Sequence, residues 1–167
     1  LLSQRAKSDP KRIVYAEADH LDVLKAAQIV CEDSMVIPIL LGRKEIILEL
    51  METLDFDVDA VQIIDPKHDD EQDQLKKYAY ELWERRRRKG ITLYDAEKLM
   101  RERNYFAAMM VVAGDADAML SGYSRAYPSV LKPILEIIGK DPKAKTVAAT
   151  NLMNTKRGPL FISDTSI

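Results

Sequence analysis

The chain has 167 residues, of which 47% are hydrophobic and 31% charged, a composition typical of one globular unit or slightly more than one. Its 25 Lys and Arg residues nearly balance 27 Asp and Glu residues, and no apolar run approaches the ~20 residues of a membrane span. These values exclude disordered, collagen-like and transmembrane chains. The net charge of −2 argues against nucleic acid as a partner, and any anion site must be local.

Few soft metal ligands occur in the sequence. Cys31 is the single cysteine, so no internal disulfide is expected, and with only two histidines the chain has too few ligands for a structural zinc site. We expect Cys31 to be a small packed side chain and the protein to be cytoplasmic. The sequence starts at Leu1 without Met and ends in the apolar, β-prone run 158–167, so it is interpreted as a fragment of a longer protein.

Short β-prone runs alternate with amphipathic segments in the first part of the chain. Strands are predicted at residues 12–16, 36–41 and 61–66, the last one ended by a proline that cannot donate to a sheet ladder. Apolar residues at helical spacing predict helices at residues 19–33 and 45–53. This alternation indicates an α/β fold with a mainly parallel sheet and right-handed crossovers.

The sequence becomes more highly charged after His68. Residues 69–89 have the spacing of a long helix, and Thr92 is a good N-cap for the next one. A further helix is predicted to begin at Asn104. Because residues 105–113 are apolar on nearly every side, we expect that helix to be buried near the centre of the domain.

A fourth strand is predicted at residues 117–121, followed by a loop at 122–128 and a helix at 129–138. The turn-forming residues 139–142 then give the clearest boundary signal in the chain. Beyond it, two strands and their connecting turn are predicted at residues 146–150, 160–163 and 154–159.

Ligands of parallel α/β sheets lie outside the carboxyl ends of the strands, so the loops that follow strands form the candidate site. Three such loops carry polar residues, at 16–20, 41–43 and 121–128. The third is the strongest candidate, because Gly122 permits close backbone approach and the hydroxyls, Arg125 and the next helix could hold a phosphate or carboxylate. A polar loop that only caps a helix, with Arg125 paired to an acidic neighbour, explains the same residues.

Five cations follow one another at Arg85–Lys89. The helix macrodipole favours positive charge at a helix C-terminus, which accounts for one or two of them. Five successive residues wind more than once round a helix, so we expect one or two to point inward, where a phosphate contact is possible, and the rest to be solvated. His20 and His68 have no metal or catalytic spacing and are assigned no role. Dinucleotide, P-loop and hydrolase motifs are absent.

The spacing of long segments resembles that of the phosphate acetyltransferase (phosphotransacetylase) family. The segments are RIVYAEADHLDVLKAA, PILLGRKEII, IIDP and RKGITLYDAEKLMRERNYFAAMMVVAGDADAMLSGYSRAYPSVLKPILEIIG. The resemblance runs from about residue 5 to the last residue and covers roughly the first half of that family's domain. Within the family, GDADAMLSGYSRAYPSVLKPILEII is most similar to the C-terminal phosphotransacetylase-like domain of large NADP-dependent malic enzymes.

The resemblance implies an isocitrate-dehydrogenase-like, three-layer α/β/α fold of two domains, which agrees with the alternation of strands and helices. Residues 1–140 would form the first domain, and residues 146–167 would begin a second one that is truncated here. The fold alone does not name the ligand; only the resemblance implies an acyl-CoA.

The departures from the family pattern bear on activity. Phosphate acetyltransferases follow the Ser-Gly pair with a histidine, several hydroxyl residues and an arginine before proline, whereas this chain has Lys132 before Pro133. Lysine keeps the charge but loses the bidentate fork that holds a phosphoryl group. The expected ligand site for an acyl-CoA or phosphate comprises Ser121, Gly122, Ser124, Arg125, Tyr127, Lys132 and Arg86. No residue is assigned a catalytic or metal-binding role.

The resemblance therefore implies a regulatory domain that senses acetyl-CoA and forms at least a homodimer within a malic enzyme. The parent enzyme would convert malate to pyruvate, CO2 and NADPH, using NADP and a divalent metal; no cofactor is expected in this segment itself. One alternative is part of an active phosphate acetyltransferase, which moves acetyl between acetyl phosphate and CoA. A second alternative is a non-catalytic α/β module that binds a phosphorylated ligand.

Overall fold

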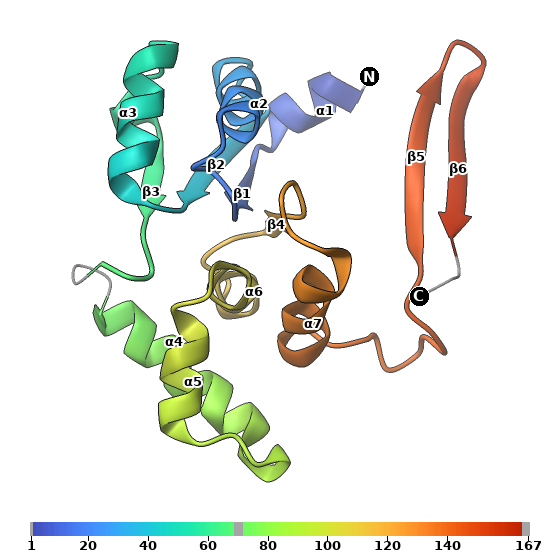
Figure 1. Ribbon diagram of the computed structural model, residues 1–167. Coiled ribbons are helices and arrows are strands. Elements are labelled where there is room, and N and C mark those ends of the chain that lie inside the picture. The colour runs from blue at the N-terminus through green and yellow to red at the C-terminus, as the bar shows by residue number, and fades with distance from the viewer. Residues whose placement is uncertain (1, 69–71, 165–167) are drawn as a thin grey trace.

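Four parallel strands form one sheet, and a two-stranded hairpin stands apart from it (Figure 1). The structure is a computed structural model that describes residues 2–68 and 72–164. The sheet has the strand order β3-β2-β1-β4, with β1 at Lys11–Tyr15, β2 at Val36–Leu41, β3 at Gln62–Ile64 and β4 at Ala118–Leu120. Every pairing in this sheet is parallel, which confirms the predicted α/β fold.

Helices connect these strands. They are α1 at Leu2–Ser8, α2 at Leu21–Glu32, α3 at Lys44–Leu54, α4 at Gln72–Arg86, α5 at Leu93–Met100, α6 at Arg103–Ala113 and α7 at Tyr127–Ile137. Two short 3-10 helices, η1 and η3, lie at Val58–Ala60 and Arg87–Lys89. Helix α1 was not predicted from the sequence.

Local chemistry fixes where two of the helices begin. Thr92 Oγ1 accepts a hydrogen bond from the Asp95 amide, while the Asp95 carboxylate accepts one from the Thr92 amide, each at 3.1 Å. This reciprocal capping box makes Thr92 the N-cap of α5, as predicted. Helix α7 begins at Tyr127, before the predicted start at Ser129, because Pro128 fits a first helical turn, where its missing N–H leaves no bond unmade.

Two predicted elements are shorter than expected. Strand β3 ends at Ile64 because Asp65 Oδ1 accepts a hydrogen bond from the Lys67 amide at 3.0 Å and so turns the chain. The helix predicted over residues 69–89 is α-helical only to Arg86 and then tightens into η3. Its first residues, 69–71, lie outside the described part of the chain.

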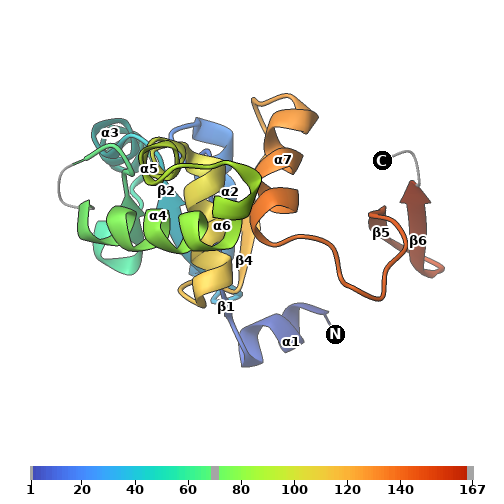
Figure 2. The same cartoon turned by 90° about the horizontal axis from the view of Figure 1, so that it is seen from below.

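The sheet is covered on both faces, which makes three layers (Figures 1 and 2). Successive residues of a strand point to opposite faces, so Tyr15 and Val14 belong to different clusters. Tyr15 packs with α2 and α3, in a cluster that contains Leu24 and Ile47. Val14 packs on the other face with α4, α5, α6 and α7.

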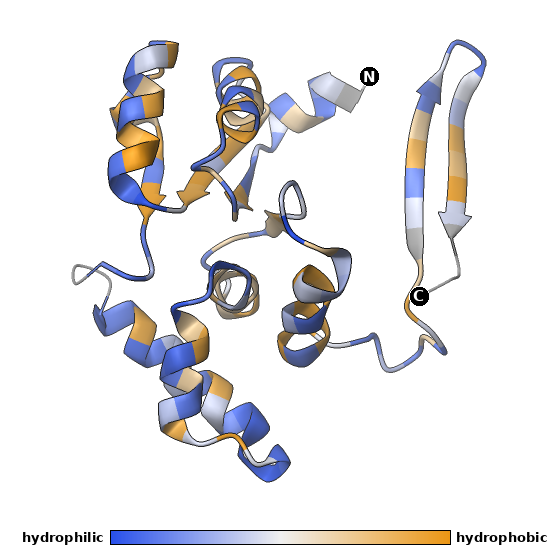
Figure 3. Cartoon of the chain, viewed as in Figure 1, coloured by the Kyte–Doolittle hydropathy of each residue, from blue (hydrophilic) through white to orange (hydrophobic). Residues whose placement is uncertain are grey.

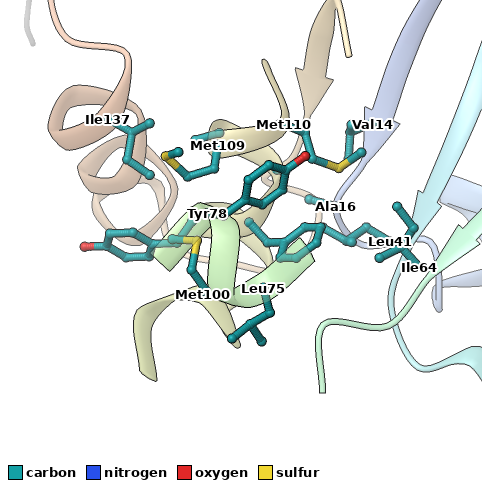
Figure 4. Close-up of a cluster of buried hydrophobic side chains, with 14 of the residues drawn as sticks. Val14, Ala16, Leu41, Ile64, Leu75, Tyr78, Met100, Met109, Met110 and Ile137 are labelled. Atoms are coloured by element: carbon teal, nitrogen blue, oxygen red, sulfur yellow. The ribbon is translucent and has the colours of Figure 1, made fainter. Parts of the chain in front are cut away.

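Helix α6 is the centre of the larger cluster. Its residues from Asn104 to Met110 are buried, which confirms most of the predicted buried stretch 105–113; the last three residues of that stretch are only partly buried. Figure 4 shows Met110 beside Val14 of the sheet and Met109 on the side of Ile137. Since α6 contacts the sheet and its covering helices at once, its apolar residues are required on nearly every side.

The hairpin consists of β5 at Ala149–Thr155 and β6 at Gly158–Asp164, paired antiparallel. Its turn is shorter than the predicted 154–159, because Thr155 Oγ1 donates to the Gly158 carbonyl at 2.7 Å and accepts from the Arg157 amide at 3.2 Å. Both strands of the hairpin contain hydrophobic stretches (Figure 3). The exposed apolar side chains along it are Leu152, Met153, Leu160, Phe161 and Ile162. Figures 1 and 2 both place the hairpin away from the sheet. The proposed division at residues 139–142 stays a prediction.

Candidate functional site

The loop after β4 closes around a carboxylate of the chain itself. Glu17, which follows β1, is 4% exposed and lies beneath this loop. Its Oε1 accepts the amides of Gly122 at 2.7 Å and Tyr123 at 3.0 Å, and its Oε2 accepts the Ser124 amide at 2.8 Å. The Ser124 hydroxyl also donates to Oε2. The donors that the sequence offered for an external anion thus converge on Glu17.

Gly122 makes this arrangement possible. Its φ of +105° lies in the left-handed region that other residues avoid, and it turns successive amides toward the same side of the loop. A side chain at this position would meet no atom within 4 Å, so the requirement for glycine here is conformational rather than steric.

Glu17 is ionised at neutral pH. Burial opposes ionisation and raises the pKa of Glu17, but the hydrogen bonds from Ser124, Gly122 and Tyr123 outweigh burial and hold that pKa at about 2. Ser121 completes the arrangement, because its hydroxyl donates to Asn104 Oδ1 at 2.7 Å and lies 3.3 Å from Glu17 Oε1. The loop therefore holds a resident negative charge.

A second buried carboxylate joins the other two candidate loops. Asp19, 8% exposed, accepts Arg43 Nε at 2.9 Å and both terminal nitrogens of Arg103 at 2.6 and 2.7 Å. Burial raises the pKa of Asp19, yet the bonds to Arg103 and Arg43 lower it to about 2. Arg43 follows β2, and Arg103 is the first residue of α6. The three polar loops predicted from sequence thus meet at the carboxyl edge of the sheet.

A cavity of about 350 Å³ lies where the strand order reverses direction, between β1 and β4. It is lined by Tyr15, Glu17, Asp22, Val23, Ala26 and residues 120–123. Tyr123 covers one side, with its hydroxyl donating to Asp22 Oδ2 at 2.5 Å and its ring 5.4 Å from that of His20. The carboxylate that faces this cavity makes it unsuited to an anion.

A second cavity, of about 360 Å³, is strongly basic. Its lining consists of Lys67, Lys98, Arg101, Glu102, Arg103 and Arg125. Arg125 is the one predicted ligand residue among them. The others were not predicted, because they come from two separate parts of the sequence, residue 67 and residues 98–103, and show no common spacing with Arg125.

Lys132 and Tyr127 are exposed on α7, and neither is among the residues that line the two cavities. Arg86 is directed inward, as expected of one or two members of the basic run. Its guanidinium donates to the backbone carbonyl and to Oε1 of Glu136 on α7, both at 3.2 Å. Glu136 Oε2 also accepts the Tyr105 hydroxyl at 2.5 Å. Arg86 therefore joins α4 to α7, and the predicted ligand residues do not form one cluster.

The family model for phosphate acetyl/butaryl transferases matches residues 1–167. The chain belongs to this family. A phosphate acetyltransferase of Thermoanaerobacterium thermosaccharolyticum is 37% identical over 150 residues, which is 90% of this chain and 44% of that protein. An NADP-dependent malic enzyme of Rhizobium meliloti is 30% identical over 167 residues, which is 98% of this chain and 21% of that protein. The predicted resemblance to the phosphotransacetylase family is thereby confirmed.

Solved phosphotransacetylase structures share the fold. The EutD phosphotransacetylase from Staphylococcus aureus matches with a TM-score of 0.79 and 27% identity, over 96% of this chain and 47% of that one. The chain thus spans less than half the length of the relatives it matches. Among the described residues, no group of three or more His, Cys, Asp or Glu side chains is placed to hold a metal ion. No helix in the described part of the chain is long and apolar enough to cross a membrane.

Proposed function

We propose that this chain is part of a regulatory phosphotransacetylase-like domain of an NADP-dependent malic enzyme. In this proposal it senses acetyl-CoA and holds subunits together, while the parent enzyme converts malate to pyruvate, CO2 and NADPH elsewhere. NADP and a divalent metal belong to that parent reaction. The reducing cytoplasm, where the single Cys31 needs no partner, is the proposed location.

The observation that best supports this proposal is that the loop after β4 closes around Glu17. Stabilisation of a transferred phosphoryl or acyl group requires preorganised donors aimed at the reacting oxygens. Three consecutive amides, those of residues 122–124, and the Ser124 hydroxyl point at Glu17 instead. A substrate anion at this loop would have to displace a buried carboxylate with a pKa of about 2.

The position of Lys132 supports the same conclusion. An arginine in a phosphoryl site gives two parallel hydrogen bonds from one rigid fork, whereas a lysine gives a single point charge on a flexible stem. Lys132 is exposed on α7 and lines neither of the two cavities. This combination favours a binding role over transfer.

An active phosphate acetyltransferase is the second candidate. It is favoured by the phosphate acetyltransferase that is 37% identical to this chain, against 30% for the malic enzyme of Rhizobium meliloti. Malic enzymes match along nearly all of the chain, over 94% for that of Rickettsia prowazekii and 98% for that of Haemophilus influenzae, but a phosphate acetyltransferase of Nitratidesulfovibrio vulgaris matches over 99%, so coverage does not separate the two candidates.

The full reading frame that encodes this chain provides the test. We expect it to contain a dinucleotide-binding fingerprint before Leu1, to reduce NADP with malate, and to change that rate when acetyl-CoA is added. We expect no acetyl-CoA formation from acetyl phosphate and CoA. Transacetylation within about tenfold of a genuine phosphate acetyltransferase, a barrier difference of only ~1.4 kcal/mol, would establish the enzyme alternative instead.

A further inference from the structure

The basic cavity brings together cations from distant parts of the chain. Lys67 follows β3, Lys98 belongs to α5 and Arg101 follows it, Arg103 begins α6, and Arg125 precedes α7. They surround one space of about 360 Å³ with a single carboxylate, that of Glu102, in the lining. Cations from loops and helices therefore converge on one concave surface beside the carboxyl edge of the sheet.

Among the described residues, most of these cations have no acidic side chain as an ion-pair partner. Within residues 2–68 and 72–164, no carboxylate lies in ion-pair contact with Lys67, Lys98, Arg101 or Arg125. Glu102 is turned toward its own helix, where its Oε2 accepts the Asn104 amide at 3.2 Å. Like charges gathered without a partner repel one another, and a bound anion would remove that repulsion.

Among the residues that line the cavity, Arg103 is held in place by hydrogen bonds to Asp19. Asp19 holds both terminal nitrogens of Arg103, at 2.6 and 2.7 Å, and shares its charge with Arg43 at 2.9 Å. Two guanidinium groups on one carboxylate leave an excess of positive charge. The N-terminal end of α6, an 11-residue helix, adds the positive end of its macrodipole.

We infer that the basic cavity lined by Lys67, Lys98, Arg101, Arg103 and Arg125 binds a diphosphate or longer phosphate group. A single carboxylate is too small a charge for four cations that have no ion-pair partner in the described part of the chain, whereas linked phosphates supply several charges and many acceptor oxygens. Nucleic acid is disfavoured, because the lining has no aromatic side chain on which a base could stack. The site shares Arg125 with the loop after β4, but it does not use the amides of residues 122–124, which bind Glu17.

Where the diphosphate belongs to acetyl-CoA, this inference rests on the proposed function and deepens it, because it names the cavity and the cations that would hold the phosphates. A diphosphate could arrive within a coenzyme such as acetyl-CoA or as a free phosphate compound. Both kinds of ligand contain linked phosphates. Competition between acetyl-CoA and inorganic pyrophosphate distinguishes a coenzyme diphosphate from a free phosphate compound.

The test titrates inorganic pyrophosphate into the chain, and into the full reading frame, by calorimetry. The double variant Lys98→Gln/Arg101→Gln removes two exposed cations of the lining. The matched control, Arg85→Gln/Arg88→Gln, removes two exposed cations from the basic run. We expect the lining variant to weaken pyrophosphate binding at least about tenfold and the control by less than about twofold.

Two results would overturn the inference. One is the absence of pyrophosphate binding to the unchanged chain; the other is equal weakening by both double variants, which would indicate only general surface charge. If acetyl-CoA displaces pyrophosphate, the diphosphate is that of the coenzyme; if it does not, a free phosphate compound is the ligand. A chain that binds pyrophosphate but no acetyl-CoA would contradict the proposed function and leave this site intact. Thermal unfolding of both variants controls for folding.

Discussion

Glu17 Oε1 and the amide nitrogen of Gly122 lie 2.7 Å apart, although 105 positions separate them in the chain. This bond joins the loop after the central strand β1 to the loop after the edge strand β4. We expect this bond to contribute to the free energy of unfolding because it is buried. If the buried amide donors lost their acceptor, they could not bond to water instead, and their full desolvation cost would remain.

The variant Glu17→Gln tests how much Glu17 contributes to stability. Glutamine has nearly the same shape, but its amide group brings N–H donors to a place already filled by N–H donors. We expect the free energy of unfolding to fall by about 2 kcal/mol, since buried donors are left without an acceptor. Urea denaturation measures the change, and Glu49→Gln, at an exposed carboxylate of α3, is the control. Equal stability of the two variants would show that Glu17 does not hold the loop.

Low pH should destabilise the folded chain through Glu17 and Asp19. The pKa of Glu17 falls from an ordinary 4.5 to about 2, and that of Asp19 from 3.8 to about 2, although burial alone would raise both. The unfolded chain therefore binds these protons more readily than the folded one. The stability they contribute is fully present above about pH 5 and is lost as the pH falls toward about 2.

The measurement is the free energy of unfolding in urea at several pH values between about 7 and 3. The unchanged chain should lose stability across this range. Glu17→Gln should show a shallower fall, because one of the two groups no longer titrates, while Glu49→Gln should keep the original slope. An unchanged slope in Glu17→Gln would contradict the assignment of acid sensitivity to this carboxylate.

The sheet was predictable because its signals are local. The apolar run 36–41 is a strand in the structure, and Thr92 and Asp95 form their capping box within four residues. Residues 105–113 were expected to be buried because an apolar helix with no polar side needs neighbours all round, and α6 is buried as far as Met110. Such features depend on spacing within a short window, which a sequence displays directly.

The site was predicted only in part. The sequence pointed to the three loops after strands, but it could not show that backbone amides near Gly122 would turn toward Glu17. Backbone donors carry no sequence signature. Arg103 pairs with Asp19 across 84 positions, a contact that no local spacing in the sequence indicates. The basic cavity was missed for the same reason, since Lys67 and Arg125 come close to residues 98–103 only after folding.

The exposed hairpin predicts self-association. Leu160 and Ile162 lie on one face of β6 and Phe161 on the other, so both faces of the hairpin expose apolar side chains. We expect at least a dimer, measured by light scattering across a range of concentrations. Leu160→Ser/Ile162→Ser should lower the mass toward that of the monomer, whereas Ile29→Ser, at an exposed position of α2, should not.

A monodisperse monomer at every concentration would contradict this prediction. Persistence of the dimer in Leu160→Ser/Ile162→Ser would place the contact outside that face. Circular dichroism of each variant shows whether the parallel sheet and its helices remain folded, because the hairpin stands apart from them in Figures 1 and 2.

The last prediction concerns acetyl-CoA binding near the loop from Ser121 to Tyr127. We expect Arg125→Ala and Lys132→Ala each to raise the dissociation constant at least about tenfold, since a charge-assisted hydrogen bond to a phosphate contributes ~1.5–3 kcal/mol. Calorimetry with acetyl-CoA measures it, with Lys25→Ala, at an exposed position of α2, as the control. The two variants also distinguish two possible binding places for the phosphates of acetyl-CoA, because Arg125 lines the basic cavity and Lys132 does not. An effect of Arg125→Ala alone would place the phosphates in that cavity. Unchanged affinity in both variants, with folding intact, would remove the loop from the site and leave the basic run at Arg85–Lys89 as the next candidate.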